Sequence, residues 1–119
     1  MKKSIVLILL LLVSVSVLAN DTLVTTDQIG DLKAEIILKW AALPHYSLSN
    51  PYDSRGQVLK NAALEFAKKN PEVKILPTVL TGDISGQMMK LLQQQAVGEI
   101  PDIAQIDSFY LPVFKDKLQ

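Results

Sequence analysis

Cysteine is absent from the 119-residue chain, and this absence excludes disulfide bonds, thiolate metal sites and cysteine nucleophiles. It also excludes a lipid anchor attached to a cysteine after export, so the chain is not expected to be a lipoprotein. Histidine occurs once, as His45 in a proline-containing stretch, and no second histidine lies near it in the sequence. Such a histidine is more typical of a surface loop than of a general base or a metal ligand.

Familiar catalytic and phosphate-binding motifs are missing as well. The chain contains no GxSxG, no HExxH and no GxxxxGK[ST] sequence, which are the signatures of common hydrolases, metalloproteases and phosphate-binding loops. The stretch TGDISG at 81–86 has two glycines but lacks the lysine of a phosphate loop. It is better interpreted as the start of a helix. We therefore expect no cofactor, no metal and no enzymatic activity.

A strong charge imbalance is also lacking, since 12 basic residues balance 12 acidic ones. Removal of residues 1–19 would take Lys2 and Lys3 away and leave ten basic and twelve acidic residues. Nucleic-acid binding normally requires a basic surface. We therefore expect no nucleic-acid partner.

Residues 1–19 have the order of a secretory signal peptide. Two lysines precede an apolar run, and valine and alanine occupy the −3 and −1 positions of a cleavage site after Ala19. The uncharged run at 4–20 also approaches the length of a membrane-spanning helix, so an uncleaved anchor is the alternative. We expect cleavage and a secreted product, periplasmic or extracellular.

The rest of the sequence alternates between predicted strands and helices. Residues 20–32 are polar and are expected to form an N-terminal tail, whereas 33–119 are expected to form one partial domain. Strands are predicted at 34–40, 73–79 and 102–106, and helices at about 54–70 and 84–97. This order predicts an α/β fold in which a βαβαβ unit forms a parallel sheet with right-handed crossovers.

Several details of these elements can also be predicted. The strand at 34–40 is apolar enough to be buried on both faces, and Pro77 places the strand at 73–79 at a sheet edge. Ser54 and Gln57 have the spacing of a capping box. Asp83 or Ser85 can cap the second helix.

Polar and aromatic residues follow the predicted strands, where ligands bind in open parallel sheets. The predicted site residues at this edge are Trp40, Tyr46, Asp83, Asp107 and Tyr110. Aromatic faces can stack on sugar rings, and carboxylates can accept hydrogen bonds from sugar hydroxyls. Core packing is the alternative role for the aromatic residues, and helix capping is the alternative for the two aspartates.

Four stretches of the sequence carry a family resemblance: IILKW at 36–40, EFAKKNPEVKI at 65–75, MMKLLQQQAVGEIPDI at 88–103 and QIDSFYLPVF at 105–114. With the signal peptide in front, their order resembles the start of an extracellular solute-binding protein of ABC-type sugar importers. That broad group includes the maltodextrin binders. The resemblance covers about 33–117.

The resemblance implies the N-terminal lobe of a periplasmic-binding-protein-like fold, here an incomplete one. Such proteins close two lobes on a sugar or oligosaccharide and deliver it to permease subunits in the membrane, without catalysis. We expect a monomer that lacks the second lobe and that binds sugar weakly alone. The alternatives are a small secreted α/β hydrolase-type enzyme that uses Asp83 and Asp107, and a membrane-anchored interaction protein.

Overall fold

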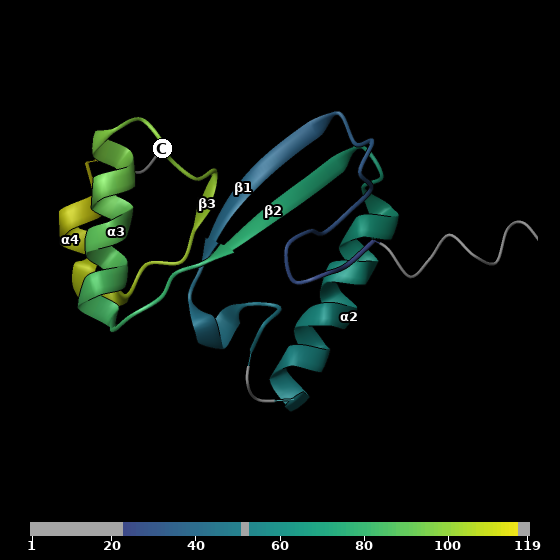
Figure 1. Cartoon of the computed structure of the whole chain (residues 1–119), viewed down its shortest axis with the longest axis horizontal. Helices are drawn as coiled ribbons and strands as arrows, with labels where there is room; N and C mark the ends of the chain where they lie inside the picture. The colour runs from purple at the N-terminus through teal and green to yellow at the C-terminus, as the bar shows by residue number, and fades with distance from the viewer. Residues whose placement is uncertain (1–22, 51–52, 117–119) are drawn as a thin grey trace, which may run out of the picture.

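The computed structural model describes residues 23–50 and 53–116, so the predicted signal peptide lies outside the described residues. The elements are β1 (Ile36–Ala42), η1 (Pro44–Tyr46), α2 (Asp53–Lys69), β2 (Val73–Val79), α3 (Ile84–Ala96), β3 (Ile103–Ala104), η2 (Ser108–Tyr110) and α4 (Leu111–Phe114). Their order confirms the predicted βαβαβ unit (Figure 1). In the described part of the chain, no helix is both long enough and apolar enough to cross a bilayer.

The sheet has three parallel strands in the order β2-β1-β3, with β1 in the centre. β1 pairs with β2 along its whole length, from Ile36 opposite Val73 to Ala42 opposite Val79. Pro77 lies opposite Trp40 in this pairing, and β2 forms a sheet edge as predicted, since proline cannot donate to a further strand. The chain therefore crosses over β1 between β2 and β3.

α2 lies along one side of the sheet, whereas α3 and α4 lie on the other side, next to β3 (Figure 1). Neighbouring residues of β1 show this division, because Trp40 packs into the core beneath α2 and Ala41 into the core beneath α3. The buried residues of the first core are Ile29, Leu48, Ala63, Ala67 and Ile75. Those of the second core are Ala41, Leu80, Met88, Leu91 and Phe114.

β1 differs from the prediction in its bounds and in its burial. The strand runs two residues further than expected, to Ala42, and the side chains of Ile36 and Ile37 are 48% and 50% exposed. The prediction of burial on both faces was therefore wrong for the amino half of β1. Among the described residues of the strands, Ala41 alone belongs to the second core, and it lies near the carboxyl end of β1.

The first turn of α2 also differs from the prediction. The helix begins at Asp53, one residue before the expected cap, and Gln57 Nε2 donates to Asn61 Oδ1 at 2.9 Å. The predicted capping box between Ser54 and Gln57 was therefore wrong. The helix ends at Lys69, as the following Asn70 and proline indicate.

α3 begins where the sequence predicts and ends at Ala96, one residue before the predicted end. Asp83 is its N-cap, with Oδ1 accepting a hydrogen bond from the Gly86 backbone N–H at 2.8 Å. Gly98 follows the helix with a φ of 79°, a left-handed conformation that commonly ends helices. Both boundaries are therefore set by local chemistry that is visible in the sequence.

β3 is shorter than predicted, with two residues in place of five. Side chains replace the backbone pairing on either side of it. Asp102 Oδ2 accepts from the Lys39 backbone N–H at 2.7 Å, and Gln105 Oε1 accepts from the Leu43 backbone N–H at 2.7 Å. The 102–106 segment thus remains attached to β1 although most of it is not strand.

Residues 23–32 pack against the sheet, in contrast to the tail expected for the polar segment. Ile29 is only 4% exposed and exchanges two backbone hydrogen bonds with Ile75 of β2, at 2.9 and 2.8 Å. Gly30 follows with a φ of 101°, and a Cβ there would lie 2.3 Å from the Val73 carbonyl oxygen. Only glycine allows this close approach, which protects part of the exposed edge of β2.

Candidate ligand-binding site

An open cavity of about 940 Å³ lies at the carboxyl edge of the sheet. We call it the edge cavity; it is lined by Leu43, Pro44, His45, Tyr46, Ser54, Arg55, Gly82, Asp83, Ile84, Gln87 and Asp107. These residues come from the segments after all three strands and from the first turns of α2 and α3. The strand order β2-β1-β3 reverses direction at β1, and the crevice beyond such a reversal is where doubly wound sheets bind ligands.

Tyr46 belongs to a firmly held turn after β1. The turn η1 is closed by the Tyr46 N–H donating to the Leu43 carbonyl at 2.9 Å and by Ser47 Oγ donating to the Pro44 carbonyl at 2.9 Å. Ser47 is fully buried, whereas the Tyr46 side chain is 56% exposed. The turn therefore presents an aromatic face to the cavity from a fixed backbone.

Asp83 reaches the edge cavity from the segment after β2. Its Oδ1 is bound to the Gly86 N–H of α3, so the carboxylate is held in one orientation. Its backbone carbonyl accepts the Gln87 N–H at 2.9 Å. The second carboxylate oxygen, Oδ2, remains an acceptor for a ligand hydroxyl.

Asp107 has the same arrangement after β3. Its Oδ1 accepts from the Phe109 backbone N–H at 3.0 Å, and its carbonyl accepts from the Tyr110 N–H at 2.9 Å. The predicted capping role of Asp83 and Asp107 is therefore confirmed, and both also line the edge cavity. Capping uses one oxygen of each carboxylate, so the two roles are compatible.

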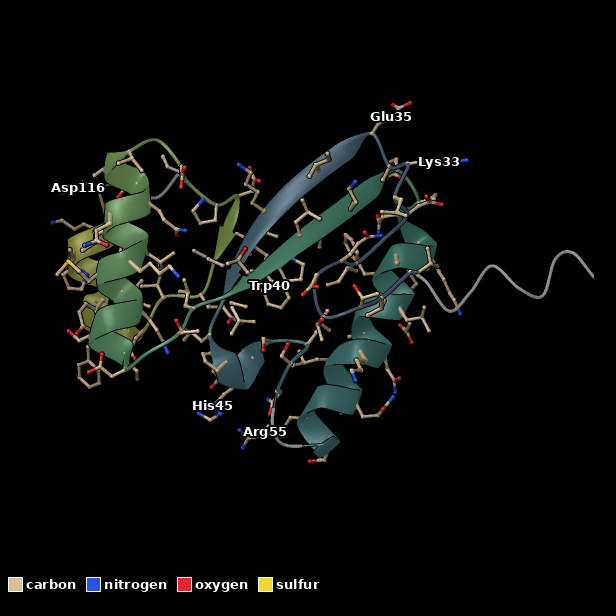
Figure 2. All side chains as sticks on the ribbon, in the orientation of Figure 1. Lys33, Glu35, Trp40, His45, Arg55 and Asp116 are labelled. Carbon is tan, nitrogen blue, oxygen red and sulfur yellow. The ribbon has the colours of Figure 1, made fainter. Side chains whose placement is uncertain are left out.

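Trp40 and Tyr110 lie outside the lining of the edge cavity. β1 extends to Ala42, so Trp40 is two residues inside the strand, and its half-buried side chain packs against the core beneath α2. Figure 2 shows the labelled Trp40 between the sheet and that helix. Tyr110 is half-buried against the core beneath α3. The structure thus brings together Tyr46, Asp83 and Asp107 of the five predicted site residues.

Arg55 and Gln87 line the edge cavity but were not predicted as site residues. Gln87 is 5% exposed, and its Nε2 donates to the Gly82 carbonyl at 2.7 Å, which holds the segment before α3 in place. Both residues lie in the first turn or two of a helix. A helix that follows a parallel strand begins at the carboxyl edge of the sheet, so this position was the signal that could have identified them.

A smaller groove of about 350 Å³ adjoins the edge cavity. We call it the side groove; its lining residues are His45, Tyr46, Ser54, Arg55, Val58 and Leu59. It shares four of these with the edge cavity and adds two apolar side chains of α2 as its floor. In Figure 2, Arg55 lies where α2 begins, and His45 lies below η1.

Across residues 23–50 and 53–116, no group of three His, Asp or Glu side chains is placed to hold a metal ion. Comparison of the chain with protein-family models, with curated proteins and with solved structures finds no match. The chemical interpretation of the site consequently depends on the residues of this chain alone.

Proposed function

We propose that this chain is a sugar-binding component of an ABC-type importer and that the edge cavity holds the sugar. The observation that carries the proposal is the convergence of Tyr46, Asp83 and Asp107 on one cavity at the carboxyl edge of the sheet. The first and the last of these residues, Tyr46 and Asp107, are 61 positions apart in the sequence. Only the parallel crossovers bring them to one place.

Sugar chemistry fits these groups for separate reasons. The exposed face of Tyr46 can cover the apolar face of a pyranose ring. Asp83 and Asp107 each keep one oxygen on a backbone N–H, and the other oxygen can accept from a ligand hydroxyl. Charge-assisted hydrogen bonds of this kind are stronger than neutral ones. Fixed acceptors around an aromatic face are therefore suited to a hydroxyl-rich ring.

The importer role is carried by the sequence resemblance rather than by the cavity. In that role the chain is exported, its signal peptide is cleaved after Ala19, and the protein acts as a monomer that delivers sugar to permease subunits. Mass spectrometry of the exported product tests the first step. We expect an N-terminus at Asn20, and a product that retains Met1 in the membrane fraction would favour the anchored interaction protein.

An enzymatic role is the second candidate, because the structure places both Asp83 and Asp107 on the same cavity. A glycosidase needs two carboxylic groups that flank one bond. Hydrolysis of aryl glycosides that is abolished in Asp83→Asn would support this role. Absence of turnover together with sugar binding would support the binding protein.

Saturation-transfer-difference NMR tests sugar binding, because it detects millimolar affinity. The edge cavity is open to solvent, so we expect weak binding of maltose, maltotriose or a related oligosaccharide to the full chain. Tyr46→Ala should abolish the signal. Phe109→Ala is the matched control, since Phe109 is 90% exposed and lies outside the cavity. No transfer to any oligosaccharide of a broad panel would contradict the proposal, as would equal effects of the two variants.

A further inference from the structure

Gln87 is the most enclosed polar residue of the edge cavity. It is 5% exposed, and of the described residues that line this cavity it is the only one that is buried. Tyr46 and Asp83, in contrast, are exposed. A ligand in the cavity therefore meets Gln87 at the most enclosed part of the lining.

The orientation of the Gln87 amide is fixed by a neighbouring backbone group. Its Nε2 donates to the Gly82 carbonyl oxygen at 2.7 Å. Because a carbonyl oxygen only accepts, the amide cannot turn over without losing this hydrogen bond. The Gln87 backbone is held as well, since its N–H donates to the Asp83 carbonyl at 2.9 Å. Oε1 therefore has a fixed position relative to the cavity.

Gln87 Oε1 is accessible to a ligand. No described residue donates a hydrogen bond to it. In the described part of the chain, the side-chain oxygens that are both fully enclosed and without a partner belong to Gln94 and Gln95, so Oε1 of Gln87 keeps contact with solvent. There is also open space at Gly82, where an added Cβ would meet no atom within 4 Å. Oε1 is thus a fixed acceptor that a ligand hydroxyl can reach.

A buried acceptor discriminates between ligands more strongly than an exposed one. When a bound ligand lacks the matching hydroxyl, the buried acceptor loses its contact with water and gains no partner. An exposed carboxylate, such as that of Asp83, can keep a water molecule in the same situation. The ordering of a long side chain also opposes binding, and at Gln87 the contact with Gly82 has already ordered it.

We propose that Gln87 is a specificity-determining residue of the sugar site, and that its Oε1 accepts a hydrogen bond from one hydroxyl of the ring in the edge cavity. Asp83 and Asp107 accept from other hydroxyls of the same ligand. Gln87 thus makes one particular hydroxyl a requirement for tight binding. This inference depends on the proposed function, since it names the residue that selects among sugars at the same site.

The test measures how each hydroxyl of the sugar is coupled to Gln87. NMR titration of the full chain gives the affinity for maltose, or for the panel sugar that binds most tightly, and for analogues in which fluorine replaces one hydroxyl at a time. Fluorine cannot donate a hydrogen bond. We expect the parent to bind one analogue about three to ten times more weakly than the sugar itself, and Gln87→Met to bind the two equally. Losses that arise at Asp83 or Asp107 should persist in Gln87→Met.

Gln93→Met is the matched control, because it makes the same change at an exposed position of α3 outside the edge cavity. It should leave all the affinity ratios unchanged. If Gln87 only held the Gly82 segment in place, Gln87→Met would weaken binding of the sugar and of every analogue by one factor, and the ratios would stay the same. That result, or equal effects of the two variants, would overturn the inference while sugar binding stands.

A second measurement, on the parent protein, does not require the variant to fold. The side-chain amide resonances of Gln87 should shift during titration with the sugar, and should shift much less with the one analogue that lacks the matching hydroxyl. The same shift with the sugar and with every analogue, or no shift at this amide, would overturn the inference. Binding of no sugar in the panel would overturn the proposed function and the inference together.

Discussion

Gln105 Oε1 accepts a hydrogen bond from the backbone N–H of Leu43 at 2.7 Å, across 62 positions of the sequence. The Gln105 backbone N–H donates in turn to the Ala41 carbonyl at 3.0 Å. One residue therefore joins the end of β1 to the segment that leads to Asp107. These contacts extend a pairing in which β3 itself supplies only two residues.

Replacement of this side chain should weaken the sheet at its carboxyl edge. Gln105→Ala leaves the half-buried Leu43 N–H without its acceptor, and we expect a loss of about 1 kcal/mol in the free energy of unfolding. Urea denaturation followed by circular dichroism measures it. Gln93→Ala makes the same change at an exposed position of α3 and should stay within about 0.5 kcal/mol of the parent. Equal midpoints for the two variants would contradict this account.

Gly30 should tolerate substitution much less than Gly82, although both have φ near 100°. Alanine at either position adopts a left-handed conformation that costs roughly 1 kcal/mol. At Gly30 the new Cβ also meets the Val73 carbonyl oxygen at 2.3 Å, whereas at Gly82 it meets nothing within 4 Å. We expect Gly30→Ala to cost roughly 3 kcal/mol or more. A cost no greater than that of Gly82→Ala in urea denaturation would show that Ile29 and Gly30 do not pack on β2.

Two variants of Asp83 can distinguish its role in helix capping from its proposed role in ligand binding. Asn caps helices about as well as Asp, whereas Ala does not, so Asp83→Asn should preserve stability and Asp83→Ala should lose about 1 kcal/mol. Both variants should bind sugar less tightly, because the amide Nδ2 cannot accept from a hydroxyl. Thermal unfolding and NMR titration measure the two effects. Unchanged affinity in Asp83→Asn would restrict Asp83 to its structural role.

The adjacent methionines of α3 should differ sharply in their contributions to stability. Met88 is fully buried in the core beneath α3, whereas the Met89 side chain is 54% exposed. Truncation of a buried methionine to alanine costs about 2–5 kcal/mol, so Met88→Ala should lose most of the cooperative thermal transition. Met89→Ala should keep it. Similar melting temperatures for both would mean that α3 does not pack as described.

The elements that could be predicted are those whose boundaries depend on local chemistry. β2 occupies the apolar run at 73–79, and α3 lies between the Asp83 cap and Gly98. The short β3 could not be predicted, because the side chains of Asp102 and Gln105 take the place of ladder hydrogen bonds there. The periodicity of apolar residues carries no information about such hydrogen bonds between side chains and a distant part of the backbone.

Some site residues could be predicted from the sequence and others could not, again depending on whether local sequence determines their place. Asp83 and Asp107 could be placed at the sheet edge because they directly follow predicted strands. Trp40 was placed there too, but Ala41 and Ala42 pair with Thr78 and Val79 and extend β1 beyond it. Alanine has little preference for strands, so the sequence did not indicate this extension. Arg55 was missed because the prediction considered the residues that directly follow the strands and not the first turn of the helix after them.

The most direct test of the central claim, that the edge cavity binds sugar, is an amide-resolved NMR titration of the full chain with an oligosaccharide. The account predicts shifts that grow with ligand concentration at Tyr46, Gly82 and Asp107, and none at Gly98, which follows the far end of α3. In Tyr46→Ala, the account predicts that these ligand-dependent shifts are lost while the rest of the spectrum is retained. Shifts centred on Gly98 or on the amino ends of the strands, with none at the edge cavity, would contradict it.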